Sequence, residues 1–192
     1  MIDFNFENKS KPQRGSILIS EPFLDDDYFS RSVILLCDHN DEGSFGFVLN
    51  KYVESPLHEL IEDFPTVEAK ISIGGPVDTS NLFFIHQLGD QLDDSVKFSK
   101  DFYLGGDFKE LTKLINSDAA KAERIRFFLG YSGWTSDQLK DELEEKSWIV
   151  INDYNEDLIF STNDDEIWKH LMEKLGGKFE VMSKFPINPS HN

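Results

Sequence analysis

The stretch Gly130-Tyr131-Ser132-Gly133-Trp134 holds a serine in the setting of a nucleophile. It resembles the Gly-x-Ser-x-Gly turn that presents a catalytic serine between a strand and a helix in many hydrolases. Trp134 stands where the last glycine of that turn would relieve crowding. The later histidines, His170 and His191, lie in an amphipathic helix pattern and in the tail. The pattern therefore favours a plain turn with Trp134 as an anchor of the core.

Cys37 and His39 form a second candidate pair. They are two positions apart, so an extended strand would point both side chains the same way. A histidine beside a thiol can generate a reactive thiolate. A lone cysteine at the end of an apolar strand is more commonly a small buried hydrophobe. The sequence leaves Cys37 open to both interpretations.

Two glycine pairs offer backbone N–H groups that an anion could bind. Gly74-Gly75-Pro76 follows a predicted strand, and Gly105-Gly106 precedes a predicted helix. Pro76 removes one donor, and no lysine motif of a phosphate-binding loop follows. Both pairs therefore favour tight turns over a phosphate cradle.

The sequence predicts no metal and no cofactor. Asp25-Asp26-Asp27 lacks the glycine and the downstream glutamate of a calcium-binding loop. The histidines at 39, 58, 86, 170 and 191 show no metal-binding spacing, and a single cysteine argues against a structural zinc site.

The net charge is −17, from 36 acidic and 19 basic side chains. This charge repels nucleic acid and anionic membranes, so we expect neither as a direct partner. It would suit a basic protein partner, although a solvated acidic surface explains it as simply. The partner is therefore an unknown protein or a small ligand.

The N-terminal sequence, the apolar runs and the cysteine content together predict a cytoplasmic protein. Residues 1–8 include acidic side chains and no apolar segment, unlike a signal peptide. The longest apolar run, Val33 to Cys37, is too short to span a bilayer. One cysteine excludes an internal disulfide and suits a reducing compartment.

The elements that would position these residues are many short strands and a few helices. Residues 124–129 and 148–151 are predicted strands that flank a helix, and Gly130 and Gly133 are predicted to turn the chain between them. Thr135 is the predicted N-cap of that helix, with Trp134 packed on Leu139. Arg124 and Arg126 would share one face of the first strand as an ion-paired surface. Further strands are expected at 15–19, 32–37, 44–49, 70–73, 82–86, 96–98, 102–104, 158–160 and 179–182.

Three more helices complete the pattern. One is capped by Ser55 with Pro56 at its first position, one is capped by Asp107, and one is capped by Asp164 and ends at Gly176. With 192 residues, we expect one domain at 15–185, a flexible segment at 1–14 and a frayed tail at 186–192. Strands joined by short turns, without regular βαβ alternation, predict an α+β fold with a mixed, largely antiparallel sheet.

Together these motifs resemble the AlgH/YqgE family of bacterial proteins, over nearly the whole chain from about Gly15 to Gly176. Each motif alone is weak, but their order and spacing are specific. The matching stretches are 15–22, 29–39, 43–50, Gly74-Gly75-Pro76-Val77, 82–86, and 130–134 with Gln138-Leu139 and Glu142-Leu143. Ser44 and Ser132 stand where alanine is common in the family, which argues further against a catalytic Ser132.

The resemblance implies an α+β domain whose mixed sheet closes partly into a barrel flanked by helices. The family is labelled a transcriptional regulator, after a genetic association with alginate production, and has no established activity. It has no recognisable helix-turn-helix. The positions that match the family's polar or backbone-exposing groups at strand ends are our candidates for a ligand-binding cleft. They are Arg31, His39, Asn50, Gly74, Gly75 and Pro76.

Two functional hypotheses follow. The first is a non-enzymatic cytoplasmic protein that binds a protein or a small ligand and regulates transcription indirectly. The alternative is a small-molecule sensor or an enzyme with a cleft near Arg31, His39 and Asn50. The two differ in whether these side chains converge on one concave site.

Overall fold

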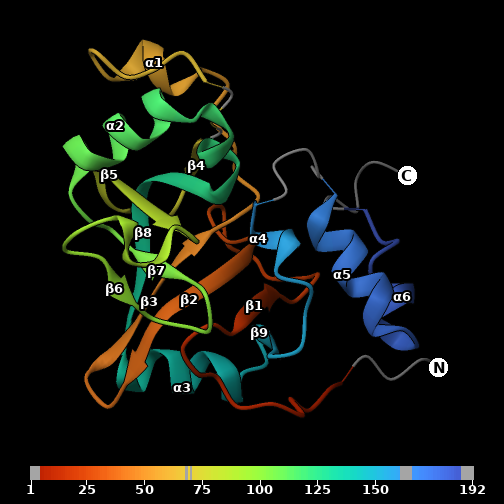
Figure 1. Ribbon diagram of the computed structural model, residues 1–192. Helices are drawn as coiled ribbons and strands as arrows, with labels where there is room; N and C mark the ends of the chain where they lie inside the picture. The colour runs from red at the N-terminus through yellow and green to blue at the C-terminus, as the bar shows by residue number, and fades with distance from the viewer. Residues whose placement is uncertain (1–4, 68, 70, 161–165, 187–192) are drawn as a thin grey trace.

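The computed structural model describes residues 5–67, 69, 71–160 and 166–186. Within these residues, one strongly curled sheet has the strand order β6-β7-β5-β8-β3-β2-β1-β9, and β4 pairs with β8 beside this path (Figure 1). All pairs are antiparallel except β4 with β8. The strands are β1 Ile17–Ser20, β2 Val33–Asn40, β3 Gly43–Val48, β4 Ile71–Ile73, β5 Val77–His86, β6 Val96–Lys97, β7 Tyr103–Leu104, β8 Ile125–Thr135 and β9 Trp148–Ile151.

Helices cover both faces and both ends of this sheet. In Figure 1, α2 lies at one end and α3 at the other, while α5 and α6 stand beside β1. The α-helices are α1 Leu57–Leu60, α2 Phe108–Ser117, α3 Ser136–Glu144, α4 Asp157–Phe160, α5 Ile167–Leu175 and α6 Lys178–Met182, with short 3₁₀ helices η1 Gly89–Gln91 and η2 Ala119–Arg124. The predicted α+β domain with a mostly antiparallel, half-closed sheet is thereby confirmed.

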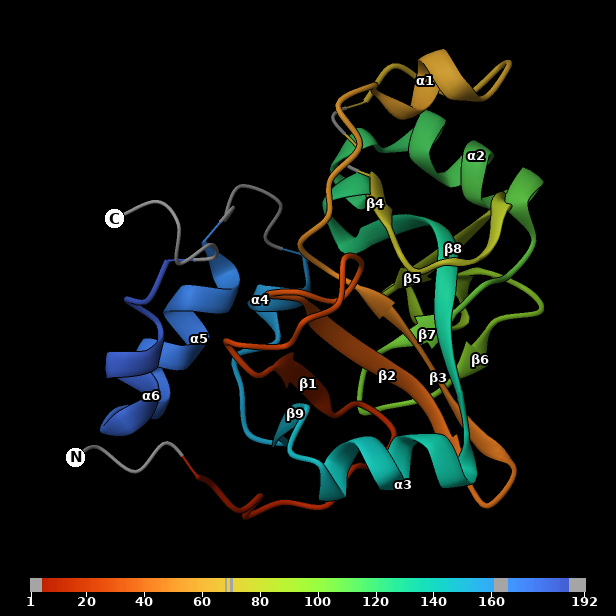
Figure 2. The same cartoon turned by 180° about the vertical axis from the view of Figure 1, so that it is seen from behind.

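Strand β8 is the longest of these strands and runs from the α2 end of the sheet to α3 (Figure 2). Its one edge pairs with β5. Its other edge pairs first with β4, at Phe127 to Leu129, and then with β3, at Ser132 to Thr135. The sequence predicted a sharp turn at Gly130, and this was wrong, because the chain continues as strand through Thr135.

The change of partner along β8 requires an unusually close backbone crossing. Gly74 donates its N–H to the carbonyl of Leu129 at 2.8 Å, and its own carbonyl accepts from Val48 N at 2.9 Å. A Cβ on Gly75 would lie 1.9 Å from the carbonyl carbon of Tyr131. Gly130 has a φ of +67°, and a Cβ there would lie 2.7 Å from the Gly75 oxygen. The glycines are present because two backbones cross without room for side chains.

Strand alternation builds two hydrophobic clusters on opposite faces of β1 and β2. Ile17, Ile19, Val33 and Leu35 belong to the cluster that also contains the α5 side chains Trp168 and Met172. The intervening residues Leu18, Ile34 and Leu36 belong to the cluster with Trp134, Leu139 and Trp148. The strand predicted at 32–37 is confirmed, and its burial on both faces explains why its sequence is a continuous apolar run.

The predicted helix caps divide into confirmed and corrected cases. Thr135 accepts from Gln138 N at 3.2 Å and Asp107 from Glu110 N at 2.8 Å, so both caps are confirmed. Gly176 ends α5 with a φ of +68°, also as predicted. The cap of α1 is Pro56 without a side-chain hydrogen bond, so the prediction of Ser55 was wrong. Asp164 lies outside the described residues.

Two predicted strands are helices. Residues 158–160 lie in α4 and residues 179–182 lie in α6. Periodicity does not separate a strand from a helical turn in an apolar run this short, so the surroundings decide. In α6, Phe179 packs its ring on Phe6 at 5.6 Å, and Met182 is buried in the core.

The pairing predicted for Arg124 and Arg126 was also wrong. Arg124 ends η2, whereas Arg126 is buried in β8 with 1% of its surface exposed. Its guanidinium donates to the carbonyls of Leu49 and Ile159, and to Ser72 Oγ at 3.1 Å. Arg126 thus ties β8 to β4, to α4 and to the end of β3 by hydrogen bonds to buried acceptors.

The N-terminal arm, residues 5–14, contains no helix or strand yet makes specific contacts. Phe6 is buried in the core. The Asn8 amide donates to Trp148 O and its oxygen accepts from Val150 N, both at 2.8 Å. One side chain therefore satisfies backbone groups on the outer edge of β9, the last strand of the sheet. These contacts anchor the first half of the segment that the sequence predicted to be flexible.

The crossing at Gly75 leads to a prediction about stability. Gly75→Ala should lower the free energy of unfolding by about 3 kcal/mol or more, the upper range of overpacking effects, because the added methyl meets backbone atoms. Urea denaturation measures this. Gly133→Ala is the control, since a Cβ there would lie 3.2 Å from the Tyr131 ring and 4.0 Å from the Ser44 carbonyl oxygen, with no backbone atom as close as at Gly75. Equal midpoints for the two variants would contradict the close crossing.

Candidate functional site

The two nucleophiles considered from sequence are both buried in structural roles. Ser132 has no exposed surface, and its Oγ donates to the Gly74 carbonyl at 3.0 Å. Cys37 is 2% exposed, and burial, assisted by Asp38, raises the pKa of its thiol well above the usual value. His39 Nδ1 lies 2.7 Å from Ser44 Oγ. The alternative of a Cys37–His39 dyad therefore finds no support in the geometry.

Of the residues predicted to share a cleft, Arg31 and Asn50 do lie together. Asn50 Nδ2 donates to the Arg31 carbonyl at 2.8 Å, while Asn50 Oδ1 accepts from Val33 N at 2.9 Å. Arg31 has a φ of +50°, in the left-handed region that side chains disfavour. Its guanidinium lies 4.8 Å from the centre of the Trp168 ring and donates to the Phe185 carbonyl. Burial lowers the pKa of Arg31. By these two hydrogen bonds, Asn50 stabilises the backbone turn that contains the left-handed Arg31.

The other predicted residues lie elsewhere. His39 is at the far end of β2, on the order of 25 Å from Arg31 at roughly 3.3 Å per strand residue. Gly74 and Gly75 form the backbone crossing with β8, and the Gly74 N–H is already bonded to Leu129, which removes it as an anion donor. Pro76 leads from that crossing into β5. The structure does not gather the six residues into one cleft.

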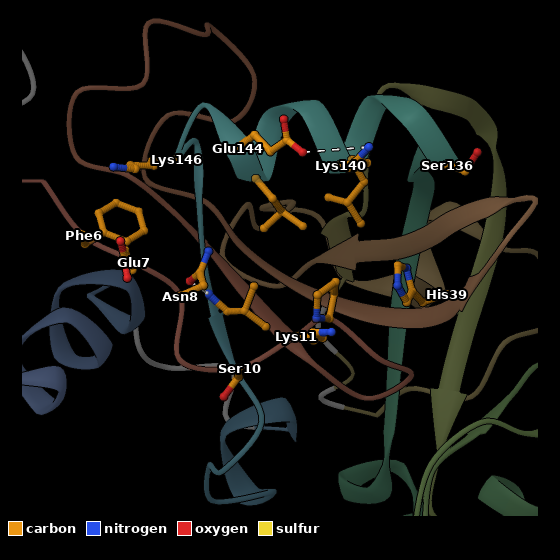
Figure 3. A pocket seen from close by; sticks show the side chains of 14 residues that line it. Phe6, Glu7, Asn8, Ser10, Lys11, His39, Ser136, Lys140, Glu144 and Lys146 are labelled. Carbon is orange, nitrogen blue, oxygen red and sulfur yellow. Dashed lines mark hydrogen bonds and ion pairs between the residues drawn. The ribbon is translucent and has the colours of Figure 1, made fainter.

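His39 instead faces an elongated groove of about 500 Å³ between α3 and the N-terminal arm (Figure 3). We call it the lysine groove. Helix α3 forms one wall and residues 6–12 the other. Ser136 and His39 lie at one end, and Phe6 and Lys146 at the other, as Figure 3 shows. The groove therefore follows the length of α3, about 13 Å for its 9 residues at 1.5 Å per residue.

The lining of the lysine groove combines an apolar floor with a mostly basic rim. The apolar part includes Leu139, Leu143, Val150 and Pro12. The rim carries Lys11, Lys140 and Lys146 against Glu7 and Glu144. Three lysines and two glutamates give the rim a net charge of +1 in a chain of net charge −17. Such a surface suits an elongated ligand with an apolar body and an anionic group.

The rim lysines are only weakly engaged by the protein. Lys140 pairs with Glu144 at 3.9 Å on the exposed face of α3, and such exposed pairs contribute little. Lys146 donates to the Asn5 side chain. His39 uses Nδ1 for Ser44, and among the described residues its Nε2 has no hydrogen-bond partner. A ligand could therefore bind these groups without breaking a strong internal contact.

A buried histidine that the sequence did not single out lies in β5. His86 is fully buried, and its Nδ1 accepts from Leu88 N at 3.2 Å, which places the proton on Nε2. Nε2 lies 3.0 Å from the Gly105 carbonyl and 3.0 Å from Ser95 Oγ. Burial lowers the pKa of His86, so the neutral form is favoured. No local motif marks this position; only the pairing of β5 and β7 reveals it.

Two features are absent from the residues that the structure describes. No helix in residues 5–67, 71–160 or 166–186 is long and apolar enough to cross a membrane. In the same part of the chain, no group of three or more His, Cys, Asp or Glu side chains could hold a metal ion.

The fold defines a single α+β domain with a curled, mostly antiparallel half-barrel and flanking helices. Solved structures that share it include protein DIP2367 from Corynebacterium diphtheriae, with a TM-score of 0.76, 20% identity and coverage of 94% of this chain and 95% of that one. The AlgH protein from Pseudomonas aeruginosa also shares it, with a TM-score of 0.71, 23% identity and coverage of 93% of this chain and 98% of that one. At these identities the similarity concerns the fold alone.

The chain belongs to the AlgH-like family, which matches residues 17–180. A UPF0301 protein of Cytophaga hutchinsonii is 45% identical over 180 residues, which cover 93% of this chain and 98% of the relative. Another from Bacteroides thetaiotaomicron is 45% identical over 186 residues, with coverage of 96% and 94%. The family suggested by the sequence motifs is confirmed.

The buried Cys37 leads to a prediction about thiol reactivity. As the only cysteine, it gives an unambiguous signal with Ellman's reagent. We expect labelling of the native protein at neutral pH to be slower than labelling in urea by two orders of magnitude or more, because reaction requires exposure and a thiolate. Rapid labelling of the native protein that His39→Ala abolishes would instead support the dyad.

The neutral His86 leads to a prediction about pH. Since its pKa is lowered by folding, the unfolded chain binds the proton more readily, and stability falls as pH drops below about 6.5. His86→Gln should be less stable at pH 7 but lose less stability between pH 7 and 5.5, by at most about 1.4 kcal/mol per pH unit. Urea midpoints of both proteins across this range provide the test, and parallel curves would contradict it.

Proposed function

We propose that this protein is a non-enzymatic cytoplasmic binding protein whose lysine groove takes a small organic anion with an apolar body. The observation that carries the proposal is the basic rim over an apolar floor in an otherwise acidic chain. Its volume of about 500 Å³ lies within the usual range for small-molecule sites.

The burial of the two candidate nucleophiles favours binding over catalysis. Ser132 and Cys37 are buried and engaged in packing, and Arg31 and Asn50 stabilise a turn far from His39. The alternative of an enzyme or sensor centred on Arg31, His39 and Asn50 loses its basis, because these side chains do not converge. A sensor centred on the lysine groove is consistent with the proposal.

Any effect on transcription would then be indirect. The net charge of −17 opposes contact with the phosphate backbone. A bound anion would instead change the wall formed by the N-terminal arm, and a protein partner would detect that change. Detection of the bound state by a protein partner would give the protein a regulatory role without a DNA-binding surface.

The proposal predicts binding of 8-anilino-1-naphthalenesulfonate, an apolar fluorophore with one anionic group. The native protein should bind it at one site, and Lys11→Ala/Lys140→Ala should weaken binding about fivefold or more, since each exposed charge contributes up to about 1 kcal/mol. Fluorescence titration at low and high salt provides the measurement, because salt screens these contacts.

Two controls separate the lysine groove from general charge and apolar effects. Lys174→Ala removes an exposed lysine of α5 outside the groove and should leave the affinity unchanged. The uncharged analogue N-phenyl-1-naphthylamine should bind equally to all variants. If the double variant binds the sulfonate as tightly as Lys174→Ala does, the lysine groove is not the site.

A further inference from the structure

We propose a second binding site, for an organic cation, on the opposite side of the β2–β3 hairpin. A cavity of about 520 Å³ lies there between the hairpin, β8 and the start of α3. We call it the aromatic cavity. It brings together two sequence motifs that the lysine groove leaves unexplained, Gly43 to Phe45 and Tyr131 to Trp134.

Aromatic rings line the floor of this cavity. The rings of Phe45 and Tyr131 are half-buried and meet edge to face at 5.2 Å. Phe47 supports Phe45 from below at 5.1 Å and stacks on Phe128 at 4.3 Å. The floor is therefore fixed by the core, and aromatic surfaces held in this way attract cations.

The rim of the aromatic cavity is acidic. Asp38 and Glu42 line it, and none of its described lining residues is Lys, Arg or His. Asp38 already pairs with Arg14 at 2.7 Å. The Glu42 carboxylate has no hydrogen-bond or ion-pair partner in the part of the chain that the structure describes, and its side chain is exposed at the hairpin turn. Glu42 is therefore the group available to a bound cation.

Because side chains alternate along β2, neighbouring residues of this strand line different sites. Asp38 and Asn40 line the aromatic cavity, while His39 between them lines the lysine groove. Helix α3 is divided in the same way, with Gln138 on one side and Leu139 and Lys140 on the other. The His39–Ser44 contact at 2.7 Å links residues from the two linings.

An aromatic floor with a free carboxylate at the rim matches an ammonium, a quaternary ammonium or a guanidinium group. The same chemistry occurs in small free cations and in lysine or arginine side chains of proteins. The proposal concerns the cationic group and does not depend on the anion site.

Choline and its uncharged isostere 3,3-dimethyl-1-butanol test the proposal. Titration of the full chain, followed by amide NMR signals of Gly43 and Gly133, should show choline binding about two- to thirtyfold more tightly than the alcohol. Glu42→Gln should weaken choline binding about two- to fivefold. The matched control Asp41→Asn removes the same charge from the same turn, outside the cavity lining, and should have no effect.

A floor variant and a second probe complete the experiment. Tyr131→Leu should abolish the preference for choline over the alcohol, while Tyr131→Phe should keep it. A capped Gly-Lys-Gly peptide that binds more tightly than choline assigns the cavity to a protein side chain, and the reverse order assigns it to a free cation. Equal binding of choline and the alcohol, or equal loss in Glu42→Gln and Asp41→Asn, overturns the proposal.

Discussion

The close backbone crossing at Gly74-Gly75 and Gly130 is the constraint on which the rest of the structure depends. It lets β8 exchange β4 for β3 on one edge, next to Tyr131, where the pairing with β5 on the other edge ends. Without that exchange, β8 would end before Ser132 and could not deliver Thr135 to cap α3. Arg126 reinforces β8 by donating to the carbonyls of Leu49 and Ile159, two buried residues of other segments. The scaffold is therefore held by backbone proximity and buried polar contacts as much as by apolar packing.

Both proposed sites follow from that scaffold. Extended β8 carries Tyr131 into the aromatic cavity and positions α3, whose outer face becomes a wall of the lysine groove. The β2–β3 hairpin passes between the two, and its alternating side chains give each site a different charge. Two surfaces thus arise from one hairpin and one helix, and the N-terminal arm completes the lysine groove.

The sequence predicted what is encoded locally. The caps at Asp107 and Thr135, the end of α5 at Gly176 and the apolar strand after Ser32 depend on neighbours in the chain, and all were confirmed. Arg31 and His39 looked like partners because both lie at strand ends, but β2 keeps them at opposite ends. The role of Gly130 and the burial of His86 and Arg126 depend on segments tens of residues away, which local patterns do not report.

One wall of the lysine groove has a consequence for how the family can diversify. That wall consists of residues 6–12, upstream of the stretch 17–180 that matches the family. The matched stretch supplies the sheet, the crossing and α3, whereas the upstream segment supplies Lys11 and Pro12. The groove is thus built jointly by the leading segment and by the matched stretch, which supplies Lys140, Lys146 and His39. Exchange of the leading segment in a relative, or in a designed chimera, would therefore change one wall of the groove together with the contacts that Phe6 and Asn8 make with the core and with β9.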